Sequence, residues 1–584
     1  MAPLALAQTD GGNNRVGFSP APEPHPKLRI GLFADSRLQP RALVEAFADI
    51  ALSDYADIVV IAVDHRVVPA LPWLWRIYEH IDRRIFGVQP DSSKPVDLFS
   101  HLASGRILRI PDTVVGDSVP ADWVAKVNAF NLDVAFVLGE IDIDAIKSAA
   151  KYGVWRFCFG VRQGALDMLD GFREVLDGSE VTASSLSASS IADSERLLYQ
   201  SWSCTSPFSV TRNRDKLLRR AAQFPARVLK ELHRSGGVSL ATCVPPNHSS
   251  SVKETTSPLV LDTPRSMARV GWRIVRRGLQ KLFCIDQWFI GYRFCIGAGG
   301  QPEVGQFSRL MPPKDRFWAD PFPIQRNGRY YIFFEELVFA AGKAHISMVE
   351  VDRHGNCSEP ERVLERPYHL SYPFLIEADG ELFMVPETAQ NRSVELYRCV
   401  RFPDRWRLEK MLLNDVYCVD ATFHHTDGKW WMFANIAEND TSIHDELHIY
   451  YADSLCGEWK SHRGNPVKSD VRSARPAGRL YERNGRLYRP AQNCAPRYGS
   501  GISINQVLAL SPETYLEREI ERIAVPLASN TLGIHTLNRA GDLCVVDGFV
   551  RRKRLGRDEG GVFAPHRLGP GQPSETAYGQ DHAI

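Results

Sequence analysis

The sequence predicts a two-domain protein in which an α/β domain with an open sheet is followed by an all-β propeller with five blades. One observation behind this prediction is a hairpin signal that recurs five times at a nearly even interval in the second half of the chain. The other is a set of continuous apolar runs, separated by helical segments, in the first third. The α/β and five-bladed classes follow from these two patterns.

Length and composition support more than one domain. The chain has 584 residues, of which 44% are hydrophobic, so it can form two or three domains with substantial cores. The expected organisation is a disordered tail over 1–26, an α/β domain over 27–205, a basic helical linker over 206–287, the propeller over 288–552 and a disordered tail over 553–584.

The hairpin signal is an Asn-Gly, Asp-Gly or similar turn followed by a run of large residues. Both central positions of a type I′ turn need a positive φ, which glycine, asparagine and aspartate tolerate best. The turns are separated by 52, 48, 57 and 56 residues. A hairpin that recurs about every fifty residues is typical of a propeller blade. The turn glycines are Gly328, Gly380, Gly428, Gly485 and Gly541.

Alignment on these turns predicts a polar rim. Positions eight before and seven after each glycine lie opposite each other in a two-residue hairpin, away from the turn, so they should share one end of the propeller. They hold mainly carboxylates and amides. Such a ring can bind a ligand, or it can merely hydrogen-bond neighbouring blades. The predicted ring consists of Asp320, Glu335, Glu336, Glu387, Asp420, Asn435, Gln492 and Asn493, joined by Arg475 and His535.

Two motifs carry a resemblance to a known superfamily. The segments FWADPF, with Asp320, and VDATFHHTDGKWWMF, with Asp420, resemble the five-bladed glycosidases and fructosidases. The resemblance implies that Asp320 is a base or nucleophile, that Asp420 is the second aspartate, and that a glutamic acid protonates the leaving group. The expected acid is absent, because Ala474-Arg475-Pro476 stands where those enzymes tend to have Glu-Gly-Pro.

The missing acid leaves alternatives open. Glu387 or Glu335 can replace it, since glycoside hydrolysis needs one protonated and one ionised carboxyl group. The arginine at position 475 favours holding an anionic sugar or sugar phosphate over hydrolysis, because a guanidinium fits carboxylate and phosphate.

Residues 288–550 as a whole are similar to the N-terminal propeller of plant glucosamine inositolphosphorylceramide transferases and of bacterial proteins encoded near surface-polysaccharide genes. In the plant proteins a separate glycosyltransferase domain follows. No such domain follows here, so we do not expect transferase activity to carry over from this resemblance.

The first third of the chain has the pattern of parallel strands joined by helices. Its apolar runs have the length and composition of strands buried on both faces, and ALVEAFADIAL between the first two has helical periodicity. We therefore expect an open doubly wound sheet, with ligands at the carboxyl ends of the strands. The runs are LRIGLF (28–33), DIVVIAV (57–63) and DVAFVLG (133–139).

From residue 132 onward the order of segments resembles the formyltransferase fold of methionyl-tRNA and sugar N-formyltransferases. The matching segments are AAKYGVWRFCFG, FREVLDGSEVTASSL and IADSERLL. The resemblance places Arg156 at the catalytic asparagine, Cys158 at the histidine and Asp193 at the aspartate. Because two of these three positions differ, we expect a degenerate domain, and formyl-tetrahydrofolate as a cofactor only if the domain is active.

Charge is concentrated in two stretches, although the net charge is only +1. Residues 211–234 and 265–281 are rich in Arg and Lys, with apolar residues at helical intervals. They can be solvated connector helices that pack on the domains, or they can contact an anionic membrane surface. Nucleic acid is not expected as a partner, because no aromatic residues are interleaved with the charge to stack on bases.

Cysteine spacing and the N-terminus suggest a cytoplasmic protein. The eleven cysteines show no CxxC pair or zinc spacing, which suits a reducing compartment, and the start lacks the charged region of a signal peptide. No metal site is expected, since His424 and His425 are adjacent on a strand and point to opposite faces. The aromatic helix 72–87, with Trp73, Trp75 and Tyr78, is expected to pack on the sheet rather than stack on a sugar.

Three functions follow as hypotheses. The first is a carbohydrate-active or carbohydrate-binding protein of surface-polysaccharide or glycolipid assembly. The second is an active sugar N-formyltransferase with an altered catalytic set. The third is a non-enzymatic scaffold that uses the propeller for docking proteins.

Overall fold

The computed structural model describes residues 26–63, 73–88, 90–102, 106–109, 121–139, 141, 146–160, 171–191, 195–236, 263–295, 307–439, 441–524 and 530–554. The two expected tails lie outside these residues, apart from Pro26, Lys553 and Arg554.

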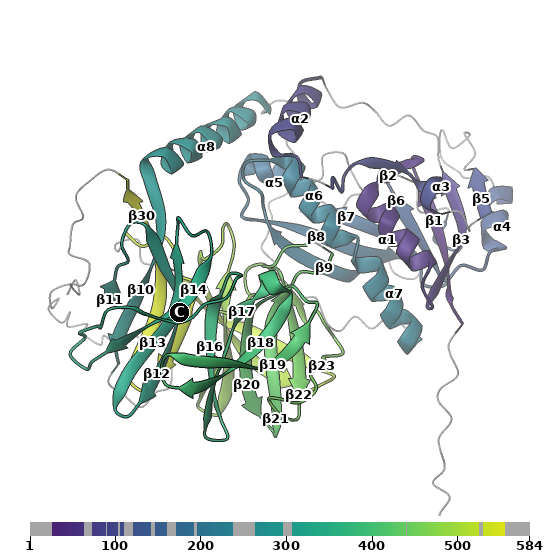
Figure 1. Ribbon diagram of the computed structural model, residues 1–584. Coiled ribbons are helices and arrows are strands. Elements are labelled where there is room, and N and C mark those ends of the chain that lie inside the picture. Colours follow the sequence, from purple (N-terminus) through teal and green to yellow (C-terminus); the bar gives the residue numbers. More distant parts are fainter. Residues whose placement is uncertain are drawn as a thin grey trace, which may run out of the picture.

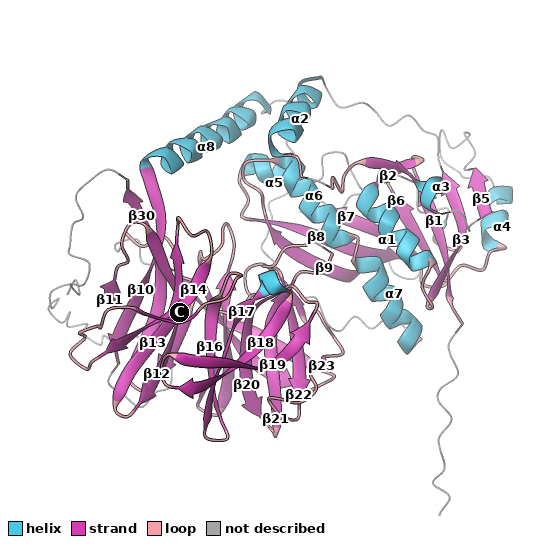
Figure 2. Cartoon of the chain, in the orientation of Figure 1, coloured by secondary structure: helices cyan, strands magenta, loops and turns pink. Residues whose placement is uncertain are grey.

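A mixed seven-stranded sheet forms the N-terminal domain (Figures 1 and 2). The spatial order is β5-β3-β1-β6-β7-β8-β9, so it reverses between β1 and β6, as in doubly wound sheets. The first five strands pair in parallel, whereas β8 and β9 are antiparallel. The strands are β1 (Leu28–Ala34), β3 (Ala56–Val63), β5 (Arg106–Arg109), β6 (Val134–Leu138), β7 (Val154–Phe159), β8 (Val181–Ser189) and β9 (Arg196–Cys204).

Helices cover both faces of this sheet. On one face α1, α6 and α7 contribute to the main core, and on the other α4 contributes Trp123 and Val127 to a second cluster. A small ribbon of β2 (Leu38–Pro40) and β4 (Pro95–Asp97) lies beside them. The helices are α1 (Arg41–Ala51), α2 (Trp73–Phe86), α3 (Leu98–His101), α4 (Ala121–Asn128), α5 (Phe172–Asp177), α6 (Val210–Ala221) and α7 (Phe224–Ser235).

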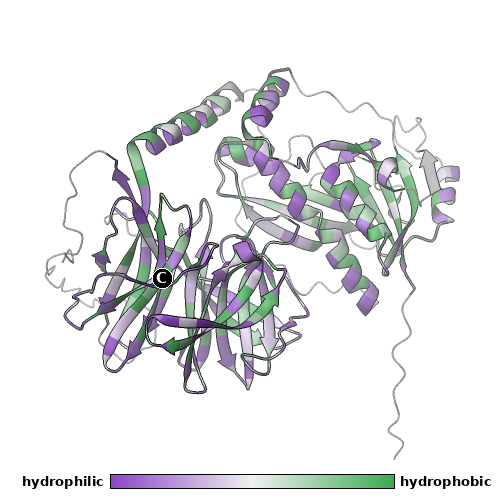
Figure 3. Cartoon of the chain, viewed as in Figure 1, coloured by the Kyte–Doolittle hydropathy of each residue, from purple (hydrophilic) through white to green (hydrophobic). Residues whose placement is uncertain are grey.

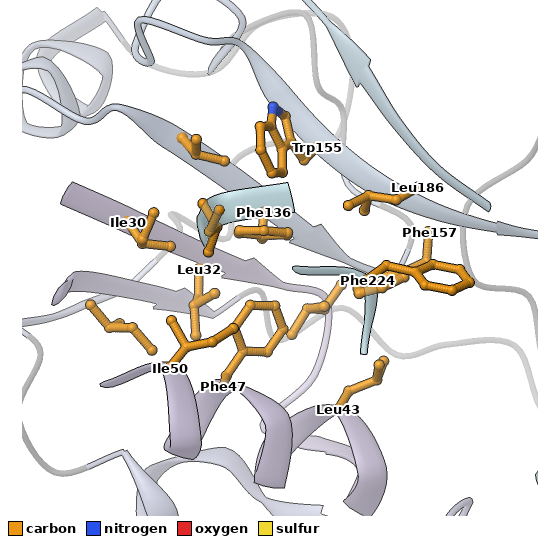
Figure 4. Packing of buried hydrophobic residues seen from close by; sticks show 14 of the residues in the cluster. Ile30, Leu32, Leu43, Phe47, Ile50, Phe136, Trp155, Phe157, Leu186 and Phe224 are labelled. Carbon is orange, nitrogen blue, oxygen red and sulfur yellow. The ribbon is translucent and has the colours of Figure 1, made fainter. Parts of the chain in front are cut away.

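Aromatic and branched side chains fill the space between α1 and the sheet (Figure 4). The rings of Phe47 and Phe136 meet edge to face at 5.0 Å, and Phe136 meets Trp155 in the same way at 5.4 Å. Leu43 and Ile50 lie on the same face of α1 as Phe47, as the helical period requires.

The expected basic linker has two different parts. Helices α6 and α7 bury Leu217, Leu218 and Leu229 in the core of the N-terminal domain. Helix α8 (Thr263–Phe283) instead leads directly into the first propeller strand (Figure 1).

Five four-stranded blades, the third carrying an additional short strand, make up the C-terminal domain, so the predicted five-bladed propeller is confirmed. The fifth blade joins both ends of the domain, because β10 and β30 pair along Cys284–Phe294 and close the circle. The first two blades are β12 (Arg316–Arg326), β13 (Arg329–Val338), β14 (Ala344–Val351) and β15 (Glu361–Leu364), then β16 (Ser371–Ala378), β17 (Glu381–Thr388), β18 (Ser393–Arg401) and β19 (Arg405–Asn414). The third is β20 (Cys418–Thr426), β21 (Lys429–Ile436), β22 (Glu446–Ala452), β23 (Lys460–Ser461) and β24 (Lys468–Ser469). The last two are β25 (Tyr481–Arg483), β26 (Arg486–Asn493), β27 (Gly501–Leu510) and β28 (Tyr515–Ala524), then β29 (Leu537–Ala540), β30 (Leu543–Lys553), β10 (Cys284–Phe294) and β11 (Ser308–Leu310).

Each predicted glycine turn joins the first two strands of its blade. In the first four turns the glycine and the residue before it both have positive φ, as a type I′ turn requires. In the fifth, Gly541 takes the first central position with φ 53°, the position that a type II′ turn reserves for glycine.

The N-terminal domain docks against the third and fourth blades. The edge of β9 meets the propeller at Trp202, whose carbonyl accepts a hydrogen bond of 2.9 Å from Val471 N, and the Arg472 guanidinium lies 4.8 Å from the Trp202 ring. Two arginines, the buried Arg220 of α6 and the half-buried Arg227 of α7, form ion pairs with Asp445 and Glu446 of the propeller. The two domains are therefore held together by buried charges as well as by backbone pairing.

Candidate functional site

Strand register brings the predicted rim positions together. Ala319 pairs with Glu335, Ser371 with Glu387, and Val419 with Asn435. In each case the pairing lies at the end of the hairpin away from the glycine turn. The residues that follow Ala319, Ser371 and Val419 therefore mark equivalent places in the first three blades.

Those three residues have an unusual backbone. Asp320, Tyr372 and Asp420 have φ values of 51°, 44° and 52°, and the strand register shifts at each of them. A bulge of this kind turns a side chain out of the regular alternation along the strand. A positive φ is uncommon for residues other than glycine. The backbone is therefore strained at equivalent positions of three blades, and this strain sets the direction of these three side chains.

One cluster is built around Asp420. Arg475 donates to it through Nε at 2.5 Å and through Nη2 at 3.2 Å, and Gln492 Nε2 donates at 2.6 Å. Glu387 lies close by, with its Oε2 atom 3.9 Å from Arg475 Nη2. Asp420, Arg475 and Gln492 are buried and Glu387 is half-buried, so the cluster holds two carboxyl groups and one guanidinium.

A second cluster is built around His535, which is 1% exposed. Its Nε2 atom lies 3.0 Å from Asp320 Oδ1 and its Nδ1 atom 2.9 Å from Asp547 Oδ2. Thr536 Oγ1 also donates to Asp320 Oδ1, at 2.8 Å. Burial alone would lower the pKa of His535, but the charges of Asp547 and Asp320 outweigh it and raise the pKa to about 10. The imidazole is therefore charged at neutral pH.

The ionisation states of the carboxyl groups differ. Burial and the charge of Asp420 hold the pKa of Glu387 well above its usual value, although Arg475 opposes them. Burial also acts to raise the pKa of Asp320, but His535 and Thr536 outweigh it and lower the pKa. Glu387 is thus shifted toward the protonated form and Asp320 toward the ionised form, and acid–base chemistry needs one carboxyl group of each kind.

The two clusters form one site, which we call the rim site. The ring of Tyr498 lies between them, 4.9 Å from the His535 ring and 4.8 Å from the Arg475 guanidinium. Glu335, from the same rim, forms an ion pair of 3.1 Å with His369. The rim site comprises Asp320, Glu335, Glu387, Asp420, Arg475, Gln492, His535 and Asp547.

Three predicted residues are placed differently from the others. Glu336 lies on the other face of its strand, where it binds Arg316, Trp318, His345 and Ser347, so it does not join the rim site. The side chain of Asn493 accepts a hydrogen bond from Ala495 N and shapes its own loop. Asn435 is buried and donates to the Ile443 carbonyl, while its Oδ1 atom has no hydrogen-bond partner in the structure.

The predicted role of Arg475 also changes. Its three nitrogens are occupied by Asp420 and by His444 Nδ1, which lies 3.0 Å from Nη1. The guanidinium packs 4.8 Å from the Tyr498 ring. Arg475 therefore neutralises Asp420 rather than offering an open fork to an anion. Sequence reasoning missed His444 and Tyr498 because both lie in loops outside the hairpin pattern.

A metal ion has only one place to bind among the described residues. Donor atoms of Asp320, His535 and Asp547 lie within 4.8 Å of one another. The proton held by His535 already supplies the positive charge between the two carboxylates. These residues fit an ion-paired imidazolium better than a metal, whose histidine ligands must be neutral.

In the N-terminal domain, the expected catalytic positions carry an ion pair. Arg156 lies 3.5 Å from Glu195, and Ser187 donates to Glu195 Oε1 at 2.8 Å. Cys158 is buried, 3.7 Å from the Ser187 hydroxyl. Asp193 lies outside the described residues. Glu195 was not anticipated from the sequence.

A pocket of about 450 Å³ opens between the two domains. Three cations of one face of α6 line it, together with hydroxyl groups from both domains and one carboxylate, Asp215. The charge of Lys216 also acts on His444, the neighbour of Arg475. The pocket is therefore a basic site close to the rim site. Its lining is Val88, Pro90, Ser206, Arg212, Asp215, Lys216, Arg219, Thr441 and Ser442.

Comparison with solved structures finds only distant likenesses. A family 117 glycoside hydrolase produced by the marine bacterium Zobellia galactanivorans is 12% identical, with a TM-score of 0.30 over 45% of this chain and 90% of that one. A GH43 beta-xylosidase/alpha-arabinofuranosidase from a compost microbial metagenome is 14% identical, with a TM-score of 0.31 over 45% and 96%. Glycinamide ribonucleotide transformylase 1 from Symbiobacterium toebii is 12% identical, with a TM-score of 0.26 over 36% and 89%. The strand pairing described above, rather than these low scores, defines the fold.

Sequence comparison is more specific. Proteins named glucosamine inositolphosphorylceramide transferase 1 from Arabidopsis thaliana and Oryza sativa subsp. japonica are 35% and 33% identical, over 211 and 205 residues. The matches cover about a third of this chain and 27% of the length of each relative. Residues 308–536 match the family described as glucosamine inositolphosphorylceramide transferase 1, N-terminal. The similarity to this family therefore lies in the propeller.

Proposed function

We propose that the rim site is a carbohydrate site at which Glu387 donates a proton to a glycosidic or leaving-group oxygen and Asp320 acts as the base. The opposite displacement of their pKa values within one buried site carries this proposal. One protonated and one ionised carboxyl group is the requirement shared by reactions that break a glycosidic bond. The names of the matched relatives, which are sugar transferases, support a carbohydrate substrate and favour transfer over hydrolysis.

The proposed substrate is an anionic sugar or a sugar phosphate of surface-polysaccharide or glycolipid assembly. Since Arg475 is engaged by Asp420, the anionic group would be held by Arg212 and Lys216 of the interdomain pocket, where Arg219 is already paired with Asp215 at 2.8 Å. Lys216 donates one hydrogen bond, to the Cys204 carbonyl, and an ammonium group carries three donors, so it can also donate to a ligand. A cytoplasmic location remains part of this proposal.

For the N-terminal domain we propose a formyltransferase-like fold that has lost formyl transfer. The Arg156–Glu195 ion pair supports this, because the resemblance calls for a neutral asparagine and a histidine at the catalytic positions. No formyl-tetrahydrofolate requirement is then expected. Formylation of an amino sugar by the unmodified protein would instead favour the alternative, an active sugar N-formyltransferase.

Substitutions that preserve shape test the rim site. In Glu387→Gln and Asp320→Asn, we expect binding of glucuronides and sugar phosphates to survive within a few-fold, because neutral amides keep the shape of both side chains. Turnover, measured as release or transfer of the sugar, should fall by about 10²–10⁴ in each variant. Glu377→Gln, an exposed carboxyl group on the second blade, is the control.

Two outcomes would contradict the proposal. One is full turnover by Glu387→Gln, which would remove the assigned proton donor. The other is failure of the unmodified protein to bind any anionic sugar in calorimetry, which would favour a scaffold instead.

A further inference from the structure

Two amphipathic helices, α2 and α8, lie together on the outside of the N-terminal domain (Figure 1). Their inner faces share one apolar cluster on α5, to which α2 contributes Tyr78 and α8 contributes Met267 and Val270. The ring of Tyr78 lies 6.3 Å from that of Phe172 at the centre of this cluster. The two helices therefore form one surface element, although nearly two hundred positions separate them in the sequence.

The outer faces of both helices are apolar. On α2 the exposed apolar side chains recur every fourth residue, at Trp73, Ile77, Ile81 and Ile85. We expected the aromatic side of this helix to pack on the sheet, but Trp73 is exposed and Tyr78 packs on Phe172 of α5 instead. On α8 a stripe at helical spacing is formed by Trp272, Val275, Leu279, Leu282 and Phe283. All nine side chains are between 49% and 68% exposed. Single exposed apolar residues are ordinary, but two adjacent stripes mark an interaction surface.

The polar residues beside these stripes are basic. Helix α8 contains six Arg or Lys residues and no Asp or Glu. Hydrophilic and hydrophobic residues are interspersed along it (Figure 3). Arg265, Arg269, Arg276 and Lys281 are exposed, whereas Arg273 donates to the Val175 carbonyl and Arg277 pairs with Asp286.

Helix α2 turns its acids inward. Glu79 pairs with Arg214, and Asp82 is buried, where it accepts hydrogen bonds from Ser209 and Thr211. Arg76 and Arg84 remain exposed. The surface formed by α2 and α8 thus offers apolar side chains and positive charge together.

We propose that α2 and α8 together dock the protein onto an anionic lipid bilayer, with both helices lying in the plane of the membrane surface. An interfacial helix has this composition, with Trp, Phe, Leu and Ile on one face and Lys or Arg beside it. Anionic headgroups attract the cations while the apolar side chains enter the boundary of the acyl chains. Among the described residues, no helix is long and apolar enough to cross a bilayer.

Charge complementarity favours a bilayer over another protein as the occupant. An amphipathic helix that binds in a groove of another protein presents one continuous apolar stripe. Here two apolar stripes lie on separate helices, and cations flank both of them. The other basic stretch, 211–234, does not share this role. Its Arg220 and Arg227 are engaged in ion pairs with the propeller, so these two cations are not offered to a membrane.

Vesicle sedimentation of the full chain tests the proposal. We expect binding to vesicles of roughly three parts phosphatidylcholine to one part phosphatidylglycerol, and about tenfold weaker binding to phosphatidylcholine alone. Raising the salt concentration should weaken binding to the anionic vesicles, because exposed charges are screened.

Two variants separate the contributions. Ile77→Asp/Leu279→Asp should lower the affinity for anionic vesicles about tenfold or more, and Arg276→Glu/Lys281→Glu should remove the preference for anionic lipid. All four side chains are exposed, so folding should not change. The matched control is Leu516→Asp/Ile520→Asp, which replaces two exposed apolar residues of β28 that do not belong to this surface. This variant should bind as the unmodified protein does.

Equal binding to neutral and anionic vesicles, or binding to neither, would overturn the proposal. A dimer in light scattering that the Ile77→Asp/Leu279→Asp variant abolishes would overturn it in favour of a second copy of the chain as the occupant.

Discussion

His535 holds a positive charge between two carboxylates in a buried part of the propeller. It forms ion pairs with Asp320 and Asp547, and the backbone N–H groups of His535 and Thr536 both donate to Asp547 Oδ1. Without a positive charge at this place, Asp320 would be pushed toward protonation by burial and could not serve as a base. The histidine thus acts on the proposed chemistry through its neighbour.

The raised pKa of His535 predicts how stability depends on pH. A histidine whose pKa is higher in the folded state stabilises the protein fully below its unfolded pKa of about 6.5, and this contribution is lost as the pH rises toward about 10. The loss should amount to a few kcal/mol over this range. In His535→Gln the thermal midpoint should be lower at pH 6.5, and the gap to the unmodified protein should narrow by pH 10. A constant gap across this range would contradict the ionised pair.

The blades show which parts of the fold are determined by residues that are neighbours in the sequence. Each glycine turn is set by two adjacent residues, so the five hairpins and their spacing were predictable. The rim positions followed from the same alignment, because strand pairing fixes which residues face each other across a hairpin. The bulges at Asp320, Tyr372 and Asp420 were not foreseen, since nothing in the local pattern distinguishes a bulged strand from a regular one.

The alternation of side chains along a strand also predicts which residue faces the rim, and the alignment on the glycine turns did not use it. Glu335 and Glu336 are adjacent in β13, so only one of them can face the rim. Glu336 instead forms four side-chain contacts within the first blade. The loop residues His444 and Tyr498 had no such signal, because their positions depend on contacts between distant segments.

Two glycines of the propeller should respond differently to alanine. Gly428 has φ 71° with open space around it, so Gly428→Ala adds backbone strain alone and should cost about 1–2 kcal/mol. Gly478 has φ 121°, and a Cβ there would lie 2.3 Å from the Leu537 carbonyl oxygen, where the fourth and fifth blades meet. Gly478→Ala should therefore cost at least about 3 kcal/mol in denaturant unfolding of the propeller. Equal costs would show that the blade contact relaxes freely.

The arrangement of the two domains was beyond sequence reasoning. The basic residues of 211–234 look alike in the sequence, and nothing local separates those in solvent from those at an interface. The structure divides them clearly, because Arg220 is 1% exposed whereas Arg234 forms an exposed pair with Glu231. The interface also places α6 over the loop that carries His444, next to the rim site. One short segment, 438–446, therefore contributes both to the interface between the two domains and to the surroundings of the rim site.

The ion pairs at this interface predict how the domains separate. Arg220 Nη2 lies 2.9 Å from Asp445, and its Nη1 atom contacts Glu446, which is fully buried. Arg220→Met would leave these two carboxylates with one fewer cation in a dry interface, and removing one partner of a buried pair typically costs about 3–5 kcal/mol. We expect a single thermal transition in the unmodified protein and two transitions in Arg220→Met, together with a larger radius of gyration in solution scattering. Arg234→Ala, which breaks an exposed pair on α7, should leave both measurements unchanged. If Arg220→Met melts in one transition at the original temperature, the buried charges do not hold the domains together, and the apolar and backbone contacts around Trp202 must do so alone.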